Sequence, residues 1–118
     1  MTLVLGIGAS SRAEVEELDE LVTRALAQQG FSLEDVTMVA SADVKREVLE
    51  PWCRAHGWAL KTHTAQRLSR QPVPTPGARA QAAIGTASVA EAAALQHGDL
   101  LTTKTVSRHA TVAIARLR

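Results

Sequence analysis

The chain has 118 residues, of which 46 % are hydrophobic and 21 % charged, an ordinary composition for a globular protein with one core. The formal net charge is +1 and only 3 % of residues are aromatic, so we expect neither nucleic acid nor a membrane surface as a partner. The single cysteine, Cys53, excludes an intrachain disulfide and suits a reducing compartment. The chain carries no signal-peptide pattern and no apolar run of roughly 18 residues. We therefore expect one cytoplasmic domain over residues 1–118.

The first thirty residues predict a strand followed by a helix. Residues 3–8 form a short apolar run, typical of a strand that is buried on both faces. Apolar residues then recur at three- and four-residue steps over residues 15–26, which predicts an amphipathic helix. Ser11 and Glu14 have the spacing of a capping box ahead of this helix, and Gly30 suits the position just after its end.

The next segment continues the alternation of strands and helices. Residues 36–40 and 58–62 are rich in apolar and β-branched side chains, and both predict strands. Residues 32–35 suit a short turn of helix before the first of these strands. Pro51 suits the first turn of a helix that runs through His56, and Thr64 suits the cap of a short helix after the second strand.

The second half begins with a proline-rich loop. Residues 72–77 cannot form regular structure, and we interpret them as a rigid surface loop that joins two halves of one sheet. Residues 78–84 predict a helix, and residues 100–103 and 110–116 predict two further strands. The last strand alternates less than a half-buried strand does, which favours a central place in the sheet.

The stretch from Gly85 to Leu95 combines a flexible turn with a helix start. Ser88 and Glu91 have the spacing of a capping box ahead of an alanine-rich helix, which Gly98 is expected to end. Gly85 permits a tight turn or a close approach to a ligand. A helix start offers unpaired N–H groups and a positive dipole end, so it suits a carboxylate or a phosphate; the alternative is a plain turn and cap.

This order of elements predicts a single three-layer α/β/α domain with a largely parallel or mixed sheet of about five strands. Ligands of such sheets gather outside the carboxyl ends of the strands. That rule selects residues 8–12, 41–45 and 102–109. The turn at 85–88 joins them if its helix faces the same edge.

Familiar signatures of cofactor sites and hydrolases are incomplete in this sequence. Gly6-x-Gly8 follows a strand, but Ser11 stands where a dinucleotide fingerprint needs its third glycine. Cys53-x-x-His56 has zinc-like spacing without a second pair, so Cys53 is better interpreted as a small core residue. The sequence contains no Gly-x-Ser-x-Gly elbow. We therefore expect no cofactor and no metal.

Two polar groups remain of chemical interest. Asp43 and Glu47 lie four residues apart at the end of a predicted strand, with Lys45 between them. Ser107 and His109 lie close together in a polar loop. A solvated helix start explains the first group equally well, and a polar loop without a catalytic role is the simpler explanation of the second.

The residues taken together resemble the C-terminal domain of the CbiG family of cobalamin biosynthesis, and its free-standing version called CobE. The resemblance runs nearly end to end. Its anchors are Gly6-Ile7-Gly8, Asp43-x-Lys45-x-Glu47, Val73-Pro74, the segment from Gly85 to Leu95, and Lys104 leading into the segment from Thr111 to Arg116. The family usually places Cys and basic residues after the glycine pair, where this chain has Ala9-Ser10-Ser11-Arg12, and Thr75 stands in place of Asn in the loop.

The resemblance implies a step of corrin-ring biosynthesis. Full-length CbiG proteins open the ring-A lactone of a cobalt-precorrin and release acetaldehyde, but this chain has no room for their additional N-terminal regions. A stand-alone domain is typical of the oxygen-dependent pathway, where that lactone is not the usual substrate. We therefore expect an accessory or carrier factor that binds a precorrin or corrinoid intermediate, with other enzymes of the pathway as possible partners. The alternative is a precorrin lactone hydrolase, and a more remote one is a nucleotide or phosphate binder.

Corrin precursors carry acetate and propionate groups, which suit a helix start together with Arg or Lys side chains. The expected ligand-binding residues are Gly8, Arg12, Asp43, Lys45, Gly85, Thr86, Ser88, Lys104, Ser107, Arg108 and His109. Asp43, Glu47 and His109 are the candidates to activate water if hydrolysis occurs. The polar loop 102–109 is expected to close over the ligand as a lid.

Overall fold

The structure is a computed structural model that describes residues 2–73, 86–102 and 104–118, with residues 86–88 described by their backbone alone. Its strands are β1 (Leu3–Ala9), β2 (Val36–Ala42), β3 (Ala59–His63), β4 (Gly98–Leu100), β5 (Thr105–Val106) and β6 (Ala110–Leu117). Its helices are α1 (Val15–Gln28), α2 (Arg46–His56), α3 (Ala65–Ser69) and α5 (Thr86–Leu95), with 3-10 turns η1 (Leu33–Asp35) and η2 (Asp43–Lys45). Within the described helices, none is long and apolar enough to cross a membrane.

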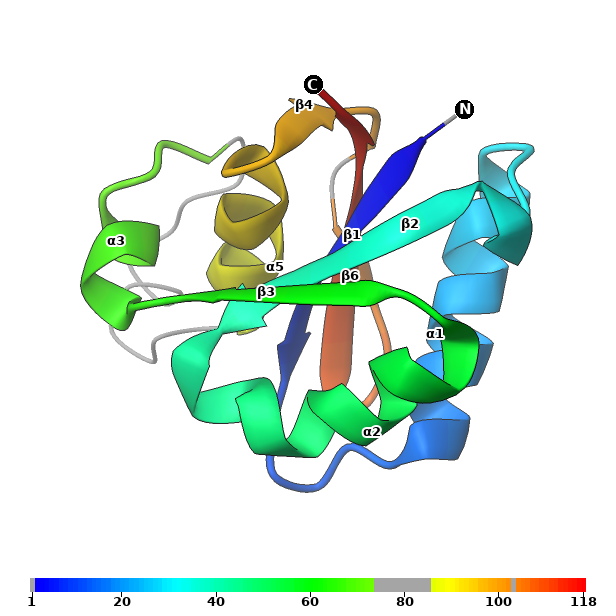
Figure 1. Ribbon diagram of the computed structural model, residues 1–118, viewed down its shortest axis with the longest axis horizontal. Coiled ribbons are helices and arrows are strands. Elements are labelled where there is room, and N and C mark those ends of the chain that lie inside the picture. Colours follow the sequence, from blue (N-terminus) through cyan, green and yellow to red (C-terminus); the bar gives the residue numbers. More distant parts are fainter. Residues whose placement is uncertain (1, 74–85, 103) are drawn as a thin grey trace.

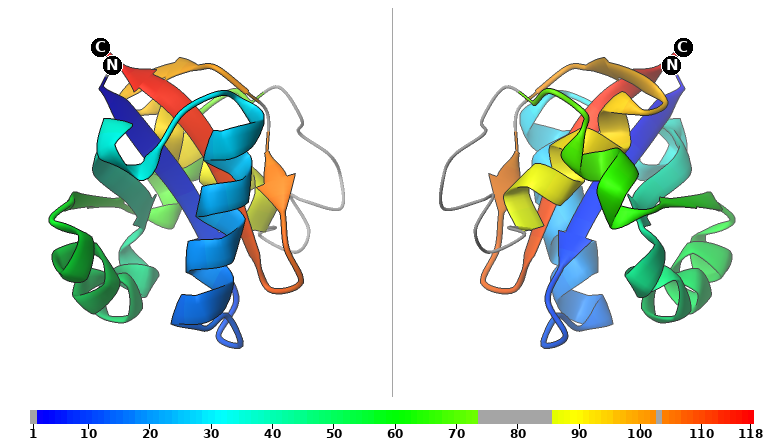
Figure 2. Two further views of the ribbon diagram at one scale, coloured as in Figure 1. Left: turned by 90° about the vertical axis from the view of Figure 1, so that its right-hand side faces the viewer. Right: turned by 90° about the vertical axis from the view of Figure 1, so that its left-hand side faces the viewer.

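These elements form three layers around one mixed sheet. The strand order is β3-β2-β1-β6-β4, and β5 also pairs with β6. Helices α1 and α2 cover one face of the sheet, while α3 and α5 cover the other (Figures 1 and 2). The α/β class and the three-layer arrangement expected from the sequence are confirmed.

The sheet is parallel in its first half and antiparallel in its second. β1 pairs in parallel with β2, and β2 with β3. β6 runs antiparallel to β1, β4 and β5. A tight turn, in which the Ser107 N–H donates to the Ala110 carbonyl at 2.8 Å, joins β5 to β6 as a hairpin. A hairpin reverses the chain, so this half of the sheet is not parallel.

The face covered by α1 and α2 has a core of large side chains. Leu3, Leu5 and Ile7 project from β1 onto this face, and each is fully buried. The helices contribute Leu18, Leu21, Val22, Leu26, Leu49 and Trp52. Cys53 belongs to the same cluster with 1 % of its surface exposed, which confirms that it is a small core residue.

The face covered by α5 is built from small side chains instead. Buried alanines of α5, among them Ala90 and Ala94, pack on the sheet, where alanines of β2 and β6 meet them. A Cβ built on Gly6 would lie 1.9 Å from the Ala90 carbonyl oxygen and 2.9 Å from the Ala94 Cβ. Gly6 is therefore needed because α5 lies directly against the β1 backbone.

Most elements of the first half agree with the predictions. All seven residues of β1 are buried, as expected of a strand covered on both faces. Gly30 follows α1 with φ of 79°, the left-handed conformation expected just after a helix end. Thr64 caps α3 by accepting a hydrogen bond from the Arg67 N–H at 3.1 Å. β6 is buried along residues 110–115 and lies inside the sheet, which confirms its predicted central place.

The predicted start of the first helix is wrong. The N-cap of α1 is Glu14 and not Ser11, and its side chain makes no capping hydrogen bond. The Ala13 N–H donates to the Ser10 carbonyl at 3.2 Å, and the Arg12 N–H donates to the Ser10 hydroxyl at 3.2 Å. These bonds form a local turn around Ser10, and the helix starts only after this turn.

Other predicted boundaries also move. α2 begins at Arg46 and contains Pro51 in its interior, because η2 leads directly into the helix. α5 begins at Thr86, so Ser88 lies within the helix and is not its cap, while Glu91 is a fully buried carboxyl group. Gly98 starts β4, and a Cβ there would lie 2.2 Å from the Arg116 carbonyl oxygen.

The predicted strand at residues 100–103 is accordingly shifted, since β4 ends at Leu100. Part of that prediction, Thr103, lies outside the described residues. So do the predicted helix at 78–84, the turn at Gly85 and most of the proline-rich loop.

Candidate functional site at the carboxyl edge of the sheet

One edge of the sheet brings together several segments that the sequence analysis selected. β1, β2 and β3 all end here, and β6 begins here, because Ala9 pairs with Ala110 and Ala42 pairs with His63. We call it the carboxyl edge. Gly8 lies inside it, in β1, paired with Thr111.

Helix α5 also starts near this edge. Its middle lies over Gly6, and Gly98, just after its end, pairs with Leu117. Leu117 is hydrogen-bonded to Thr2 at the opposite end of β1. The first turn of α5, with Thr86 and Ser88, is therefore directed toward the carboxyl edge, as Figure 2 also shows.

The turn before β6 is held by a carboxylate of α1. The Glu17 Oε2 atom accepts a hydrogen bond from the Ser107 hydroxyl and another, at 2.6 Å, from the His109 backbone N–H. Glu17 Oε1 lies 3.0 Å from His109 Nδ1. The side chains of Glu17 and His109 are 19 % and 27 % exposed. Residues 107–109 are thus tied to α1 in this structure, and a lid motion would have to break these contacts.

The same contacts act on the ionisation of Glu17. The Ser107 hydroxyl and the His109 backbone N–H, and then the His109 ring, hold the pKa of the Glu17 carboxyl below its ordinary value against an opposing effect of burial. Glu17 therefore stays a carboxylate at neutral pH. A carboxylate at Nδ1 leaves Nε2 of His109 as the ring nitrogen directed away from α1. Among the described residues no hydrogen-bond partner of this Nε2 atom is found.

Glu17 is a residue of this edge that sequence reasoning did not single out. It precedes His109 by 92 residues, and within the helix pattern it reads as one of several acidic residues in the first turn. The sequence offered one signal for Glu17, its position in the predicted helix directly before Leu18, which the structure shows to be buried.

The positively charged candidates at this edge have no carboxylate partner within the described part of the chain. Arg12 and Arg108 are exposed and Lys45 is half-buried. None of the ion pairs among residues 2–73, 86–102 and 104–118 involves these three residues or Lys104. Their charges are therefore available to an acidic ligand.

The remaining candidates are placed as follows. Asp43 is exposed at the start of η2, and Glu47 is exposed in the first turn of α2. Lys104 directly precedes β5, whose Thr105 pairs with Val112, so its backbone runs beside β6 and not at the carboxyl edge itself. Gly85 lies outside the described residues.

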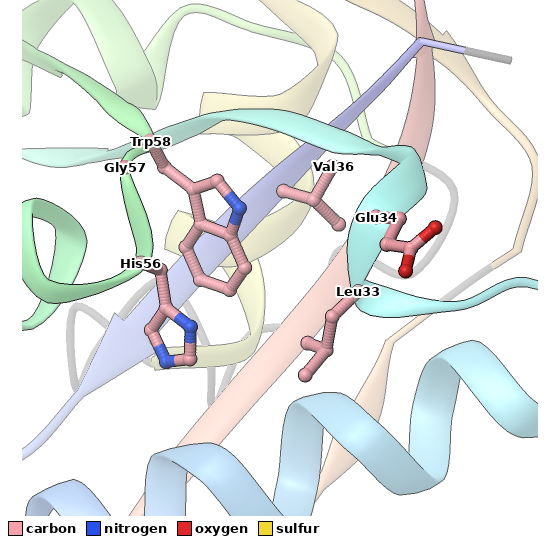
Figure 3. Close-up of a pocket in the computed structure, with 6 residues that line it drawn as sticks. All are labelled: Leu33, Glu34, Val36, His56, Gly57 and Trp58. Carbon is pink, nitrogen blue, oxygen red and sulfur yellow. The ribbon is translucent and has the colours of Figure 1, made fainter.

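Two hollows of the structure lie elsewhere, at the edge where β2 and β3 begin. One, of about 360 Å³, is lined by Leu33, Glu34, Val36, His56, Gly57 and Trp58 (Figure 3). The His56 ring stacks on Trp58 with ring centres 4.2 Å apart. The second, of about 390 Å³, shares Leu33 and Glu34 with it. None of the predicted site residues lines either hollow.

The contacts around His56, which lines the first of these hollows, serve to pack the helices and the sheet together. His56 Nε2 lies 3.0 Å from Asp19 Oδ1, and the Trp52 indole N–H donates to the same oxygen at 2.8 Å. Trp52 also meets Trp58 edge-to-face with ring centres 5.3 Å apart. This network fixes the end of α2 against α1 and the start of β3.

Comparison with known proteins gives a consistent result. Residues 3–115 match the family described as the cobalamin synthesis G C-terminus. The chain is 35 % identical, over 121 residues, to the protein CobE from Sinorhizobium sp., covering 96 % of this chain and 79 % of that protein.

Solved structures show the same fold. The crystal structure of CobE, a protein from the cobalamin (vitamin B12) biosynthetic pathway, superimposes with a TM-score of 0.81 at 32 % identity, covering 98 % of this chain and 93 % of that one. A cobalamin biosynthesis protein G homologue from Sulfolobus solfataricus gives 0.80 at 21 % identity; this chain is covered completely and spans 37 % of that protein. The cobalamin biosynthesis protein chiG from Agrobacterium tumefaciens gives 0.67 at 23 % identity, with 98 % of each chain covered.

Proposed function

Because this chain belongs to the cobalamin synthesis G C-terminus family and is a cobalamin biosynthesis protein, we propose that it binds a polycarboxylate precorrin or corrinoid intermediate as an accessory or carrier factor. The expected setting is the cytoplasm, where other enzymes of the pathway would deliver and receive the intermediate.

The observation that carries the proposal is the set of uncompensated positive charges at the carboxyl edge. Arg12, Lys45 and Arg108 form no ion pair with the described carboxylates, and the start of α5 points to the same edge. Guanidinium and ammonium groups, together with a helix start, are the groups that bind carboxylates best. A ligand with several acetate and propionate arms would satisfy all of them at once.

A second candidate function is hydrolysis of a precorrin lactone, and the Glu17–His109 pair favours it. The His109 Nε2 atom would accept a proton from water while the water oxygen attacks the lactone carbonyl carbon. The ring C–O bond then breaks, and the imidazolium returns the proton to the leaving alkoxide, so that one water is added overall. Glu17 would hold the ring through Nδ1 and stabilise its charged form. Ser107 donates to Glu17, so water and not the serine is the nucleophile in this scheme.

The test is titration of the purified protein with a set of corrin precursors, followed by mass spectrometry of the recovered ligand. A carrier binds and returns the ligand with its mass unchanged. A ligand that gains one water, or loses a two-carbon fragment, supports the hydrolase, and His109→Gln should then abolish the mass change. No binding of any precursor would contradict both candidates.

The location of the site is tested with matched charge removals. We expect Arg12→Ala and Lys45→Ala each to weaken binding about tenfold or more, since a hydrogen bond to a charged group contributes about 1.5–3 kcal/mol. The control is Arg54→Ala, which removes an exposed positive charge near the end of α2, paired with Glu50 at 2.9 Å. Equal weakening in all three variants would indicate a nonspecific effect of net charge.

A further inference from the structure

Two histidines from distant parts of the chain share one hydrogen bond on the α5 side of the sheet. His63 is the last residue of β3, and His97 lies between α5 and β4. Their Nε2 atoms are 2.8 Å apart, and their ring centres are 4.9 Å apart. One ring must donate and the other accept, so the hydrogen bond survives only while at least one ring is neutral.

The charges around this pair are mostly positive. Lys61 of β3, Arg67 of α3 and Arg118 at the chain end act on the pair, and Asp43 of η2 is the opposing negative charge on His63. Burial first, and then these positive charges together with the second imidazole, lower the pKa of His97. The pKa of His63 is lowered for the same reasons, by burial and by Arg67.

The positive charges are only partly satisfied within the described chain. Arg118 pairs with Asp99 at 3.2 Å. Arg67 donates to the neutral Gln96 side chain at 2.9 Å, and neither Arg67 nor Lys61 forms an ion pair with a described carboxylate. A carboxylate arriving here would therefore gain two uncompensated cations without displacing a protein carboxylate.

We infer that the surface formed by Lys61, His63, Arg67 and His97 binds carboxylate groups of an anionic ligand and takes up a proton on the histidine pair as it does so. His63 pairs with Ala42, next to Asp43, so this surface begins at the carboxyl edge, and from there it extends along the α5 side to His97, just after the end of α5. The inference rests on the proposed function, because it assigns part of the same polycarboxylate ligand to this surface.

The proton uptake follows from linkage. An anion beside the pair offsets the repulsion that Lys61 and Arg67 exert on an added proton, so the liganded pair holds a proton at a higher pH than the free pair. By reciprocity, lower pH must then strengthen ligand binding. If one proton is taken up, the affinity rises by up to about tenfold for each pH unit of acidification, in the range between the titration midpoints of the free and the liganded pair.

The experiment uses uroporphyrin, a tetrapyrrole with eight carboxylates, as the probe. Its affinity is measured calorimetrically between pH 5.5 and 8.5 for the wild type and for the His63→Gln/His97→Gln double variant. Glutamine keeps a polar side chain but does not titrate. We expect affinity to increase toward acid pH in the wild type and the increase to be reduced in the double variant. His56→Gln, which changes a histidine at the other edge, is the control and should keep the wild-type slope.

A second readout separates this inference from the proposed function. Histidine ring signals in NMR give the titration midpoints of His63 and His97, with and without uroporphyrin or benzenehexacarboxylate. Higher midpoints with either probe support the inference. Uroporphyrin binding with unmoved midpoints and an unchanged slope in the double variant overturns the inference and leaves the proposed function standing. A response to benzenehexacarboxylate without uroporphyrin binding supports the surface and counts against the proposed function. No binding of either probe overturns both.

Discussion

The two faces of the sheet are packed in opposite ways. Under α1 and α2 the core consists mostly of leucine, valine, isoleucine and tryptophan side chains, whereas under α5 it consists mostly of alanines, which pack against a strand glycine. Large side chains keep a helix away from the sheet, and small ones allow the backbones to meet. α5 therefore has little freedom to shift, so its start is held toward the carboxyl edge. α1 instead reaches that edge through the side chain of Glu17.

This difference in packing predicts that one methyl group added on the α5 face lowers the stability of the protein more than any other change considered below. Gly6→Ala places a Cβ 1.9 Å from the Ala90 backbone oxygen, so α5 or β1 must move. We expect a loss of about 3 kcal/mol in the free energy of unfolding, at the upper end of the cost of overpacking. Chemical denaturation measures it.

The matched control is Ile7→Val, which removes one methyl group from the other face of the same strand. It should cost about 1 kcal/mol. If Gly6→Ala proved no more destabilising than this control, the close packing of α5 would be wrong.

A second prediction concerns the histidine pair on the α5 side. The pKa values of His63 and His97 are lowered in the folded protein, whereas the unfolded chain titrates near the ordinary value of 6.5. Between these values the unfolded chain binds more protons, so stability is complete above pH 6.5 and falls as the pH drops below it. Thermal unfolding from pH 5 to pH 8 should show this fall in the wild type. It should be weaker in the His63→Gln/His97→Gln variant, and an identical fall in both proteins would contradict the assignment.

A third prediction concerns Glu17 on the α1 side, and its pH dependence has the same sign but lies at lower pH. The pKa of this carboxyl is lowered, so its contribution is present above the ordinary value of 4.5 and is lost as the pH falls through the lowered pKa. Glu17→Gln should remove this contribution at neutral pH and release the turn before β6. Hydrogen exchange of the His109 amide should become faster in the variant. Glu16→Gln, in the same turn of α1, is the control and should leave that exchange unchanged.

The last prediction, with the smallest expected effect, concerns the reactivity of the Cys53 thiol. Burial, and then the charge of Glu50, raises the pKa of this thiol to about 11. It should react with a thiol reagent at pH 8 only when the protein unfolds, since the thiolate is the reactive form. Rapid labelling of the folded protein would show that the core under α2 opens readily.

Sequence reasoning was sufficient where structure depends on neighbouring residues. The apolar run of β1, the three- and four-residue spacing of α1 and the Thr64 cap are local patterns, and the structure confirms them. Helix starts were less secure, since Ser11 competes with a turn formed by Ser10.

The site depended on contacts between distant residues and was predicted only in part. Gly8, Asp43 and His109 were placed at one edge because the carboxyl ends of parallel strands meet there. The contacts of Glu17 with His109 and of His63 with His97 span 92 and 34 residues, and no local pattern announces them. The direction of β6 was likewise set by a hairpin that the spacing of strands did not distinguish from a crossover.

The central claim is that the ligand binds at the carboxyl edge and not in the hollows at the opposite edge. Amide chemical shifts, recorded while uroporphyrin or a corrin precursor is added to the labelled protein, test it most directly. The account predicts the largest changes at residues 8–12, 43–45 and 107–109, with little change at His56 and Trp58. Changes concentrated around His56 and Trp58, with the carboxyl edge unaffected, would contradict it.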